Sequence, residues 1–108
     1  YFDEVENWAN KLIILDKGEL LYYGSIDQFF SKFYHYALIE IVNQELDHLV
    51  KDDIEKINAD VYFNAKIVTH NKEQMNDVIN ILNERKIEFK INMQNIYSTY
   101  LISTLEEI

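Results

Sequence analysis

The hydrophobic pattern of the first third of the chain predicts a short helix and then a β-hairpin. Apolar residues between Tyr1 and Asn10 recur at helical spacing, at positions Phe2, Val5, Trp8 and Ala9. This spacing predicts a short amphipathic helix. Two continuous apolar runs follow, 12–15 and 20–23, separated by the turn sequence Asp16-Lys17-Gly18. Two antiparallel strands joined by a tight turn are expected here, because Gly18 can adopt the positive φ that short hairpin loops require.

A helix is predicted directly after the hairpin. Gly24 ends the second apolar run, and Ser25 stands three residues before Gln28 in the pattern of a capping box. This pattern predicts a helix that continues through Phe29 and Phe30.

The pattern changes again beyond this helix, near residues 31–35. We therefore expect two parts, with a first part at 1–33 and a second part at 34–108. No proline and no low-complexity linker separates them.

The second part predicts strands and helices in alternation. Strands are expected at 36–42, 61–67 and 87–93, where apolar and polar residues alternate. Three helical stripes lie after these strands: Leu46, Leu49, Val50, Ile54 and Ile57; Met75, Val78, Ile79 and Leu82; and Tyr97, Tyr100, Leu101, Thr104, Leu105 and Ile108. Asn71 with Gln74 is expected to cap the second of these helices, which ends near Arg85-Lys86. The order strand, helix, strand, helix, strand, helix indicates an α+β fold whose helices cover one face of a small sheet.

Composition narrows the function classes. The 108 residues carry a formal net charge of -9, and a sequence so acidic disfavours nucleic acid and anionic membrane surfaces as partners. The chain has no cysteine, which excludes disulfides and thiolate metal sites and fits a cytosolic protein. No apolar run approaches the length that spans a bilayer, so direct membrane insertion is not expected.

No residue is assigned a catalytic, cofactor-binding or metal-binding role. The three histidines, His35, His48 and His70, are far apart in sequence and lack the spacing of metal ligands. The acidic group 52–55 lacks the glycine of a calcium loop, and Gly18 and Gly24 are isolated rather than part of a phosphate-binding loop. Ser25, Ser31, Ser98 and Ser103 have no recognisable nucleophile setting. The tyrosines Tyr22, Tyr23, Tyr34, Tyr36, Tyr97 and Tyr100 are interpreted as packing at a core edge or a protein interface.

Residues 3–29 resemble the end of the nucleotide-binding domain of ATP-binding cassette transporters, in particular of multidrug and antibiotic-peptide exporters. The resemblance rests on Asp3-Glu4-Val5-Glu6, on the apolar run that ends at Asp16, on Gly18, and on Gly24-Ser25, which occur in the family's order. It implies that a histidine contacting the γ-phosphate of ATP stands immediately before Tyr1. The phosphate-binding loop, the magnesium-binding segment and the signature sequence would lie farther upstream.

The resemblance implies an ATPase parent that binds ATP and Mg²⁺, while this chain alone has no cofactor and is not an enzyme. Residues 36–108 resemble more loosely the carboxy-terminal extension of such exporters, which implies a ferredoxin-like sheet with a closing helix at 95–105. The implied partners are a second ATPase subunit or a copy of this chain, and a transmembrane permease that would hold the subunit at the inner face of the cell membrane.

Two further expectations follow. The chain begins at Tyr1 within a predicted helix, which favours a cut piece of a longer protein. The apolar hairpin, separated from a larger sheet, is expected to dock on its own accessory domain or to pair with another copy through its open edge. The alternative function is a separate α+β domain that senses a small ligand; a saturable thermal shift with an amino acid or nucleotide would favour it.

Overall fold

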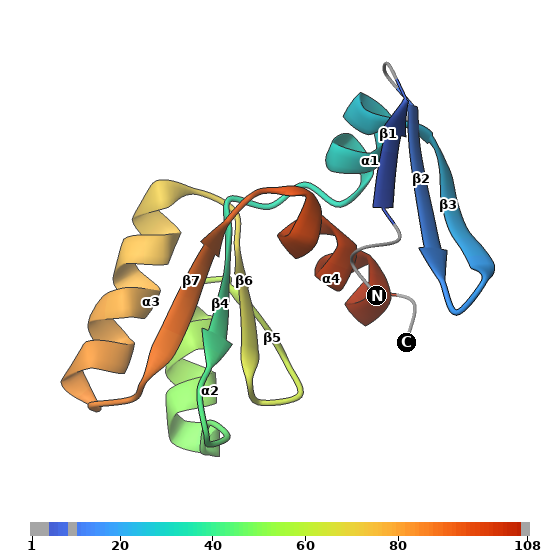
Figure 1. The fold of residues 1–108 in the computed structure, drawn as a ribbon. Helices are drawn as coiled ribbons and strands as arrows, with labels where there is room; N and C mark the ends of the chain where they lie inside the picture. The colour runs from blue at the N-terminus through green and yellow to red at the C-terminus, as the bar shows by residue number, and fades with distance from the viewer. Residues whose placement is uncertain (1–4, 9–10, 107–108) are drawn as a thin grey trace. The chain divides into compact units, whose positions relative to one another are not determined.

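The structure is a computed structural model that describes residues 5–8 and 11–106. Its backbone divides into two compact units, Tyr1–Tyr34 and His35–Ile108, at a boundary one residue from the expected one. Each unit has a sheet and at least one helix (Figure 1). The mixed α+β class predicted from the sequence is confirmed.

The first unit is built on a three-stranded antiparallel sheet in the order β1-β2-β3. Its elements are β1 (Val5–Trp8), β2 (Lys11–Asp16), β3 (Glu19–Ser25) and the helix α1 (Ile26–Lys32). The predicted hairpin is confirmed: Asp16 pairs with Glu19, and the two residues between them, Lys17 and Gly18, have φ values of 53° and 81°. Two consecutive positive φ values are typical of the type I′ turn, whose twist matches that of the flanking strands.

The helix predicted at the start of the chain is wrong for the described residues. Val5–Trp8 is a strand that pairs antiparallel with β2, from Val5 opposite Ile14 to Trp8 opposite Lys11. A short apolar pattern does not distinguish a helix turn from a strand, and pairing with an adjacent strand supplies backbone hydrogen bonds that a four-residue helix cannot. The rest of that predicted helix, at residues 1–4 and 9–10, lies outside the described residues.

The second unit contains a four-stranded antiparallel sheet in the order β5-β6-β4-β7. Its strands are β4 (Ala37–Ile41), β5 (Asp60–Tyr62), β6 (Lys66–Thr69) and β7 (Phe89–Met93), and its helices are α2 (His48–Lys56), α3 (Lys72–Glu84) and α4 (Ile96–Glu106). Figure 1 shows β7, β4, β6 and β5 side by side, with α2 and α3 packed along the sheet. Without α4, the chain order is βαββαβ, and with this strand order it is the ferredoxin-like arrangement.

The single strand predicted at 61–67 is wrong, because this segment forms the β5–β6 hairpin. Phe63 and Asn64 both have φ 55°, and the Ala65 N–H donates to the Tyr62 carbonyl at 3.1 Å. Asparagine tolerates the left-handed region, whereas phenylalanine rarely adopts it, so the alternating pattern concealed the turn. The extra strand is what completes the four-stranded sheet.

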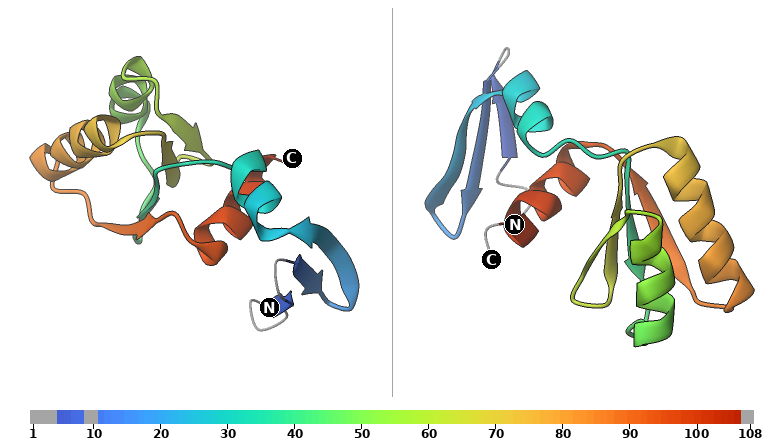
Figure 2. Two further views of the ribbon diagram at one scale, coloured as in Figure 1. Left: turned by 90° about the horizontal axis from the view of Figure 1, so that it is seen from above. Right: turned by 180° about the vertical axis from the view of Figure 1, so that it is seen from behind.

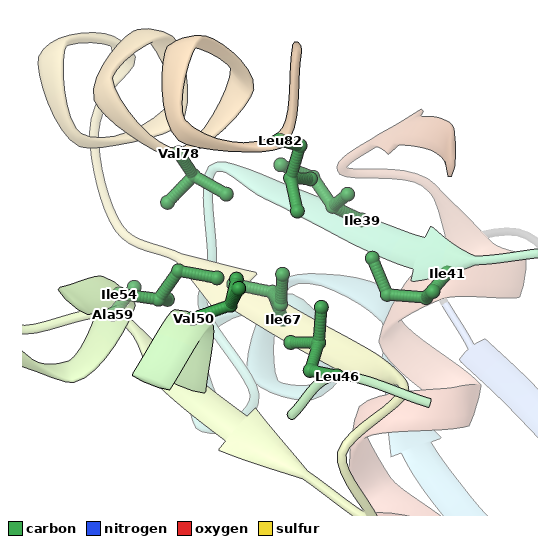
Figure 3. Packing of buried hydrophobic residues seen from close by; sticks show 9 residues of the cluster. All are labelled: Ile39, Ile41, Leu46, Val50, Ile54, Ala59, Ile67, Val78 and Leu82. Carbon is green, nitrogen blue, oxygen red and sulfur yellow. The ribbon is translucent and has the colours of Figure 1, made fainter. Parts of the chain in front are cut away.

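The main core lies between the sheet of the second unit and the helices α2 and α3 (Figure 3). Its buried members come from β4, β6, both helices and the adjoining loops: Ile39, Ile41, Leu46, Val50, Ile54, Ala59, Ile67, Val78 and Leu82. The predicted helical stripes supplied most of them. Leu49 is an exception, since it belongs to the predicted stripe of α2 but is 60% exposed.

Helix α3 starts at its predicted capping residue, and α4 starts at a cap that the sequence analysis did not predict. The Asn71 side chain accepts from the Gln74 N–H at 2.8 Å at the start of α3, and α3 ends at its C-cap Arg85. Helix α4 is capped by Asn95, which accepts from the Ser98 N–H at 2.7 Å, while the Ser98 hydroxyl accepts from the Asn95 N–H at 2.9 Å. This reciprocal pair satisfies backbone donors that the first helical turn cannot.

The predicted stripe of α4 is only partly right. Tyr100 and Leu105 are buried, but Leu101 and Thr104 are half-buried and Ile102, which the stripe omitted, is 1% exposed. Ile108 lies outside the described residues. The buried positions of α4 are spread around the helix, and this is why a single stripe did not describe it.

Candidate functional site

The segment that carries the family resemblance folds into a closely connected hairpin and helix. Ser25 caps α1 by accepting from the Gln28 N–H at 3.0 Å, as its sequence position predicted. The Tyr22 hydroxyl donates to the Ser25 carbonyl at 3.1 Å, and the Tyr22 ring lies 4.7 Å from the ring of the buried Phe29. Gly24 and Ser25 therefore connect the last strand of the hairpin to its helix.

The side chain of Tyr22 lies close to Gly24. A Cβ atom at Gly24 would lie 2.8 Å from the Tyr22 hydroxyl oxygen and 3.1 Å from its Cζ, with no other side chain as near. Gly24 is therefore explained by close packing. The interpretation of Gly24 as a turn glycine is wrong, because it lies within β3 and pairs with Leu12.

We expect Gly24→Ala to destabilise the first unit by about 1 kcal/mol, because the Tyr22 ring must move and its hydrogen bond to Ser25 is lost. Hydrogen exchange of the β3 and α1 amides would measure the change. Adding Tyr22→Phe removes the atom that is approached most closely, so the double variant should recover part of the loss. Equal exchange rates in Gly24→Ala and the unchanged chain would contradict this explanation.

A polar group of three side chains, Glu40, Lys66 and Asn92, lies on the face of the second sheet that is opposite α2 and α3. Glu40 stands on the central strand β4, directly opposite Lys66 on β6 and Lys90 on β7. Lys66 Nζ lies 3.2 Å from Glu40 Oε2, and Asn92 Nδ2 donates to Glu40 Oε1 at 2.9 Å. Since both side chains of the ion pair are about a quarter exposed, at 30% for Lys66 and 21% for Glu40, the group is partly shielded from water.

This polar group is a structural feature of the sheet with every carboxylate oxygen of Glu40 occupied. Its members are 26 and 52 residues apart in sequence, and only the alternation of polar residues along the strands could have indicated it. Cross-strand pairs of opposite charge stabilise a sheet modestly. The arrangement fixes neighbouring strands and offers no free nucleophile or metal ligand set.

The three histidines lie at separate places, as the sequence indicated. His35 is fully buried, and its Nε2 lies 2.8 Å from the Ser98 hydroxyl. His70 Nε2 lies 3.0 Å from Asp60 Oδ2 at the exposed end of the β5–β6 pair. His48 is the first residue of α2. The pairing of His35 with Ser98 joins residues 63 positions apart, and sequence reasoning missed it.

The remaining candidates take ordinary places in the fold. Asp53 on α2 pairs with Arg85 at 3.1 Å and lies 4.0 Å from Lys56, so the acidic group 52–55 is a solvated helix face with basic neighbours. Ser31 lies in α1, and Ser103 donates to the Tyr100 carbonyl at 2.6 Å in α4. Among the residues that the structure describes, no three His, Cys, Asp or Glu side chains gather in a way that could hold a metal ion.

Neither the lengths of the helices nor similarity to known proteins assigns a function to this chain. In the described part of the chain, no helix is long and apolar enough to cross a membrane. Comparisons with protein-family models, with curated proteins and with solved structures find no match to this chain.

Apolar side chains on the surface are the most prominent remaining feature. Leu20 and Tyr23 on β3 are 60% and 62% exposed, and Ile91 and Met93 on β7 are 41% and 46% exposed. Both strands lie at an edge of their sheets. Exposed apolar residues on edge strands are typical of surfaces that contact other chains. The candidate functional regions are therefore sheet edges suited to protein contacts.

Proposed function

We propose that this chain is the carboxy-terminal part of the ATPase subunit of an ATP-binding cassette exporter. Its first unit would complete the nucleotide-binding domain, and its second unit would be an accessory domain that contacts partners. In this proposal the chain supports ATP-driven transport without binding nucleotide or catalysing a reaction by itself.

The observation that carries the proposal is the local geometry of residues 11–32. These residues form two antiparallel strands, a tight turn with Gly18, and a helix opened by Gly24-Ser25. The resemblance of residues 3–29 implies these elements in this order. It also implies the start of a helix at Asp3-Glu4-Val5-Glu6, and there the described residues differ, because Val5–Trp8 is a strand. The division of the chain at Tyr34, followed by a ferredoxin-like unit, is the arrangement that the resemblance implies for the accessory domain.

The chemistry of phosphoryl transfer would come from the longer parent. That reaction requires a phosphate cradle, a magnesium ligand and a group that positions water, and the sequence of this chain contains no motif for any of the three. ATP and Mg²⁺ are therefore proposed as ligands of the parent, bound by residues upstream of Tyr1.

The proposed partners are a second ATPase subunit, or a second copy of this chain, and a transmembrane permease at the inner face of the cell membrane. Exposed apolar residues on the sheet edges support a role in contacts between proteins. A net charge of -9 opposes binding to nucleic acid.

Calorimetric titration of ATP with Mg²⁺ into this chain and into the longer parent protein tests the proposal. We expect no heat of binding for the chain and saturable binding for the parent, whose sequence should contain a histidine immediately before Tyr1. A matched parent variant with that histidine replaced by alanine should bind ATP but lose hydrolysis.

Two outcomes would overturn the proposal. One is ATP hydrolysis by this chain alone. The other is a gene in which Tyr1 directly follows a start codon, with no phosphate-binding loop upstream. If the second occurs together with a saturable thermal shift by an amino acid or nucleotide, the ligand-sensing alternative replaces it.

A further inference from the structure

The second sheet buries apolar side chains on both of its faces. Leu38 on β4 and Val68 on β6 stand opposite each other, each beside a residue of the main core, Ile39 and Ile67. Neighbouring residues of a strand point to opposite faces, so Leu38 and Val68 lie on the face away from α2 and α3. They are 0% and 3% exposed, although neither belongs to the main core. Another element must therefore cover them.

Helix α4 is the element of the second unit that lies on this side of the sheet. Figure 2 shows α4 (red) across the sheet from α2 and α3. Every residue from Ile96 to Leu105 is buried or half-buried, and Ile102 is 1% exposed. The buried side chains of α4 are therefore the cover that the second unit provides for Leu38 and Val68.

The main core of the unit is complete without α4. Its buried residues, and the partly buried residues packed against them, come from residues 39–89, before α4 begins. The βαββαβ arrangement also ends with β7, directly before α4. Helix α4 can therefore leave the sheet while α2 and α3 still fill the main core.

The sequence of α4 makes it a weak helix by itself. Four of the residues 96–105 are Ser or Thr and none is charged, so ion pairs between successive turns do not support it. The hydroxyls of Thr99, Ser103 and Thr104 donate to backbone carbonyls at 2.6 Å, a contact that slightly destabilises helices. A helix of 11 residues is marginal alone in water. The stability of α4 therefore depends on its attachment to the rest of the unit.

The attachment at the start of α4 is a specific polar contact. The Ser98 hydroxyl accepts from the Asn95 N–H at 2.9 Å and lies 2.8 Å from Nε2 of the fully buried His35. The residue after His35 is fixed in the sheet, because the Tyr36 N–H donates to the Thr69 carbonyl at 2.7 Å. The His35–Ser98 contact therefore ties the first turn of α4 to the segment that enters β4.

We propose that α4 is a lid that detaches from the sheet as a unit while the main core stays folded, and that the His35–Ser98 contact is its latch. Opening uncovers Leu38 and Val68 and leaves the βαββαβ arrangement intact. Elements with few contacts to a core commonly open at a lower free energy than the whole domain. The lid goes beyond the proposed function and does not depend on it.

Thiol labelling of single cysteine variants of the full chain tests the lid, because the sequence has no cysteine. Val68→Cys lies under α4, and the adjacent Ile67→Cys lies in the main core. If α4 opens by itself, Val68→Cys should react roughly tenfold faster than Ile67→Cys, which only unfolding of the core exposes. Lys90→Cys, at an exposed position of the sheet, gives the rate without protection.

Two results of this labelling would overturn the lid. Equal rates for Val68→Cys and Ile67→Cys would show that both faces open only together. Equal rates for Val68→Cys and Lys90→Cys would show that α4 does not cover the position.

A second substitution in the Val68→Cys chain tests the latch. Adding Ser98→Ala should speed labelling roughly tenfold or more, because buried polar groups lose their partners, whereas Ser103→Ala on the same helix should leave the rate unchanged. His35→Phe keeps the Asn95–Ser98 cap and should also speed labelling. Equal rates with Ser98→Ala and Ser103→Ala, or no change with a folded His35→Phe, would overturn the latch. If His35→Phe does not fold, the comparison of the two serine variants decides.

Hydrogen exchange of a core variant tests whether α4 opens separately. Ile39→Val weakens the main core and should speed exchange of the β4 and β6 amides roughly fivefold. The amides of α4 should exchange at their original rate, because the main core is intact when the lid is open. Equal acceleration of α4, β4 and β6 would overturn the proposal. No readout here involves ATP, so failure of the lid and failure of the proposed function are distinguished.

Discussion

Replacing Leu82 with alanine should lower the free energy of unfolding of the second unit by about 3 kcal/mol. Leu82 is fully buried and packs among Ile39, Val78 and the other core residues between α3 and the sheet (Figure 3). Removing its branched end leaves a cavity that neighbours on a rigid sheet cannot fill, so the cost includes both lost burial and the void.

Urea unfolding, followed by hydrogen exchange of the β4 and β6 amides, measures this loss in the second unit separately from the first. Leu49→Ala on α2 is the matched control, since it removes the same atoms from a leucine that is 60% exposed. It should change stability by less than about 0.5 kcal/mol. Similar losses for both variants would show that the core is not where the structure places it.

Ser98→Ala should lower the stability of the second unit by about 2 kcal/mol. The Ser98 hydroxyl is fully buried, lies 2.8 Å from His35 Nε2, and accepts from the Asn95 N–H at 2.9 Å. The alanine variant removes both bonds and leaves polar groups in a region that water does not reach, which costs more than the bonds themselves contribute. The start of α4 would lose half of its reciprocal cap at the same time.

Ser103→Ala is the control on the same helix. Its hydroxyl donates only to the carbonyl of Tyr100, three residues earlier, and the helix backbone does not depend on that bond. Thermal unfolding of the two variants should therefore differ by several degrees. If Ser98→Ala and Ser103→Ala unfold at the same temperature, the His35–Ser98 contact does not stabilise the unit.

Much of the local structure could be predicted because the signals act between near neighbours. Ser25 and Asn71 start their helices by binding N–H groups three residues later, and the Asp16-Lys17-Gly18 turn closes its hairpin with two adjacent positive φ values. Such contacts depend on spacing alone. The errors arose where the same spacing fits two structures, as in Val5–Trp8, or where a residue takes an uncommon conformation, as Phe63 does.

The candidate site could be predicted only in part. Sequence reasoning placed no catalytic or metal-binding group, and it expected the hairpin edge to be the surface for pairing. β1 covers one side of that hairpin, and whether β3 pairs with another chain stays a prediction. The edge of β7 could not be identified, because its alternation is the same as that of an inner strand such as β4.

The sequence by itself predicted the α+β class, the helices beyond residue 24 and most of the apolar residues that fill the main core, but it wrongly placed a helix at Val5–Trp8. Periodicity and capping specify these features, since both are properties of short segments. Only the tertiary structure decided which strands are central and which are edges, and which distant polar residues meet, such as Glu40 with Lys66 and His35 with Ser98. Strand order and buried polar contacts depend on pairing between residues far apart in the chain, and no local pattern specifies that pairing.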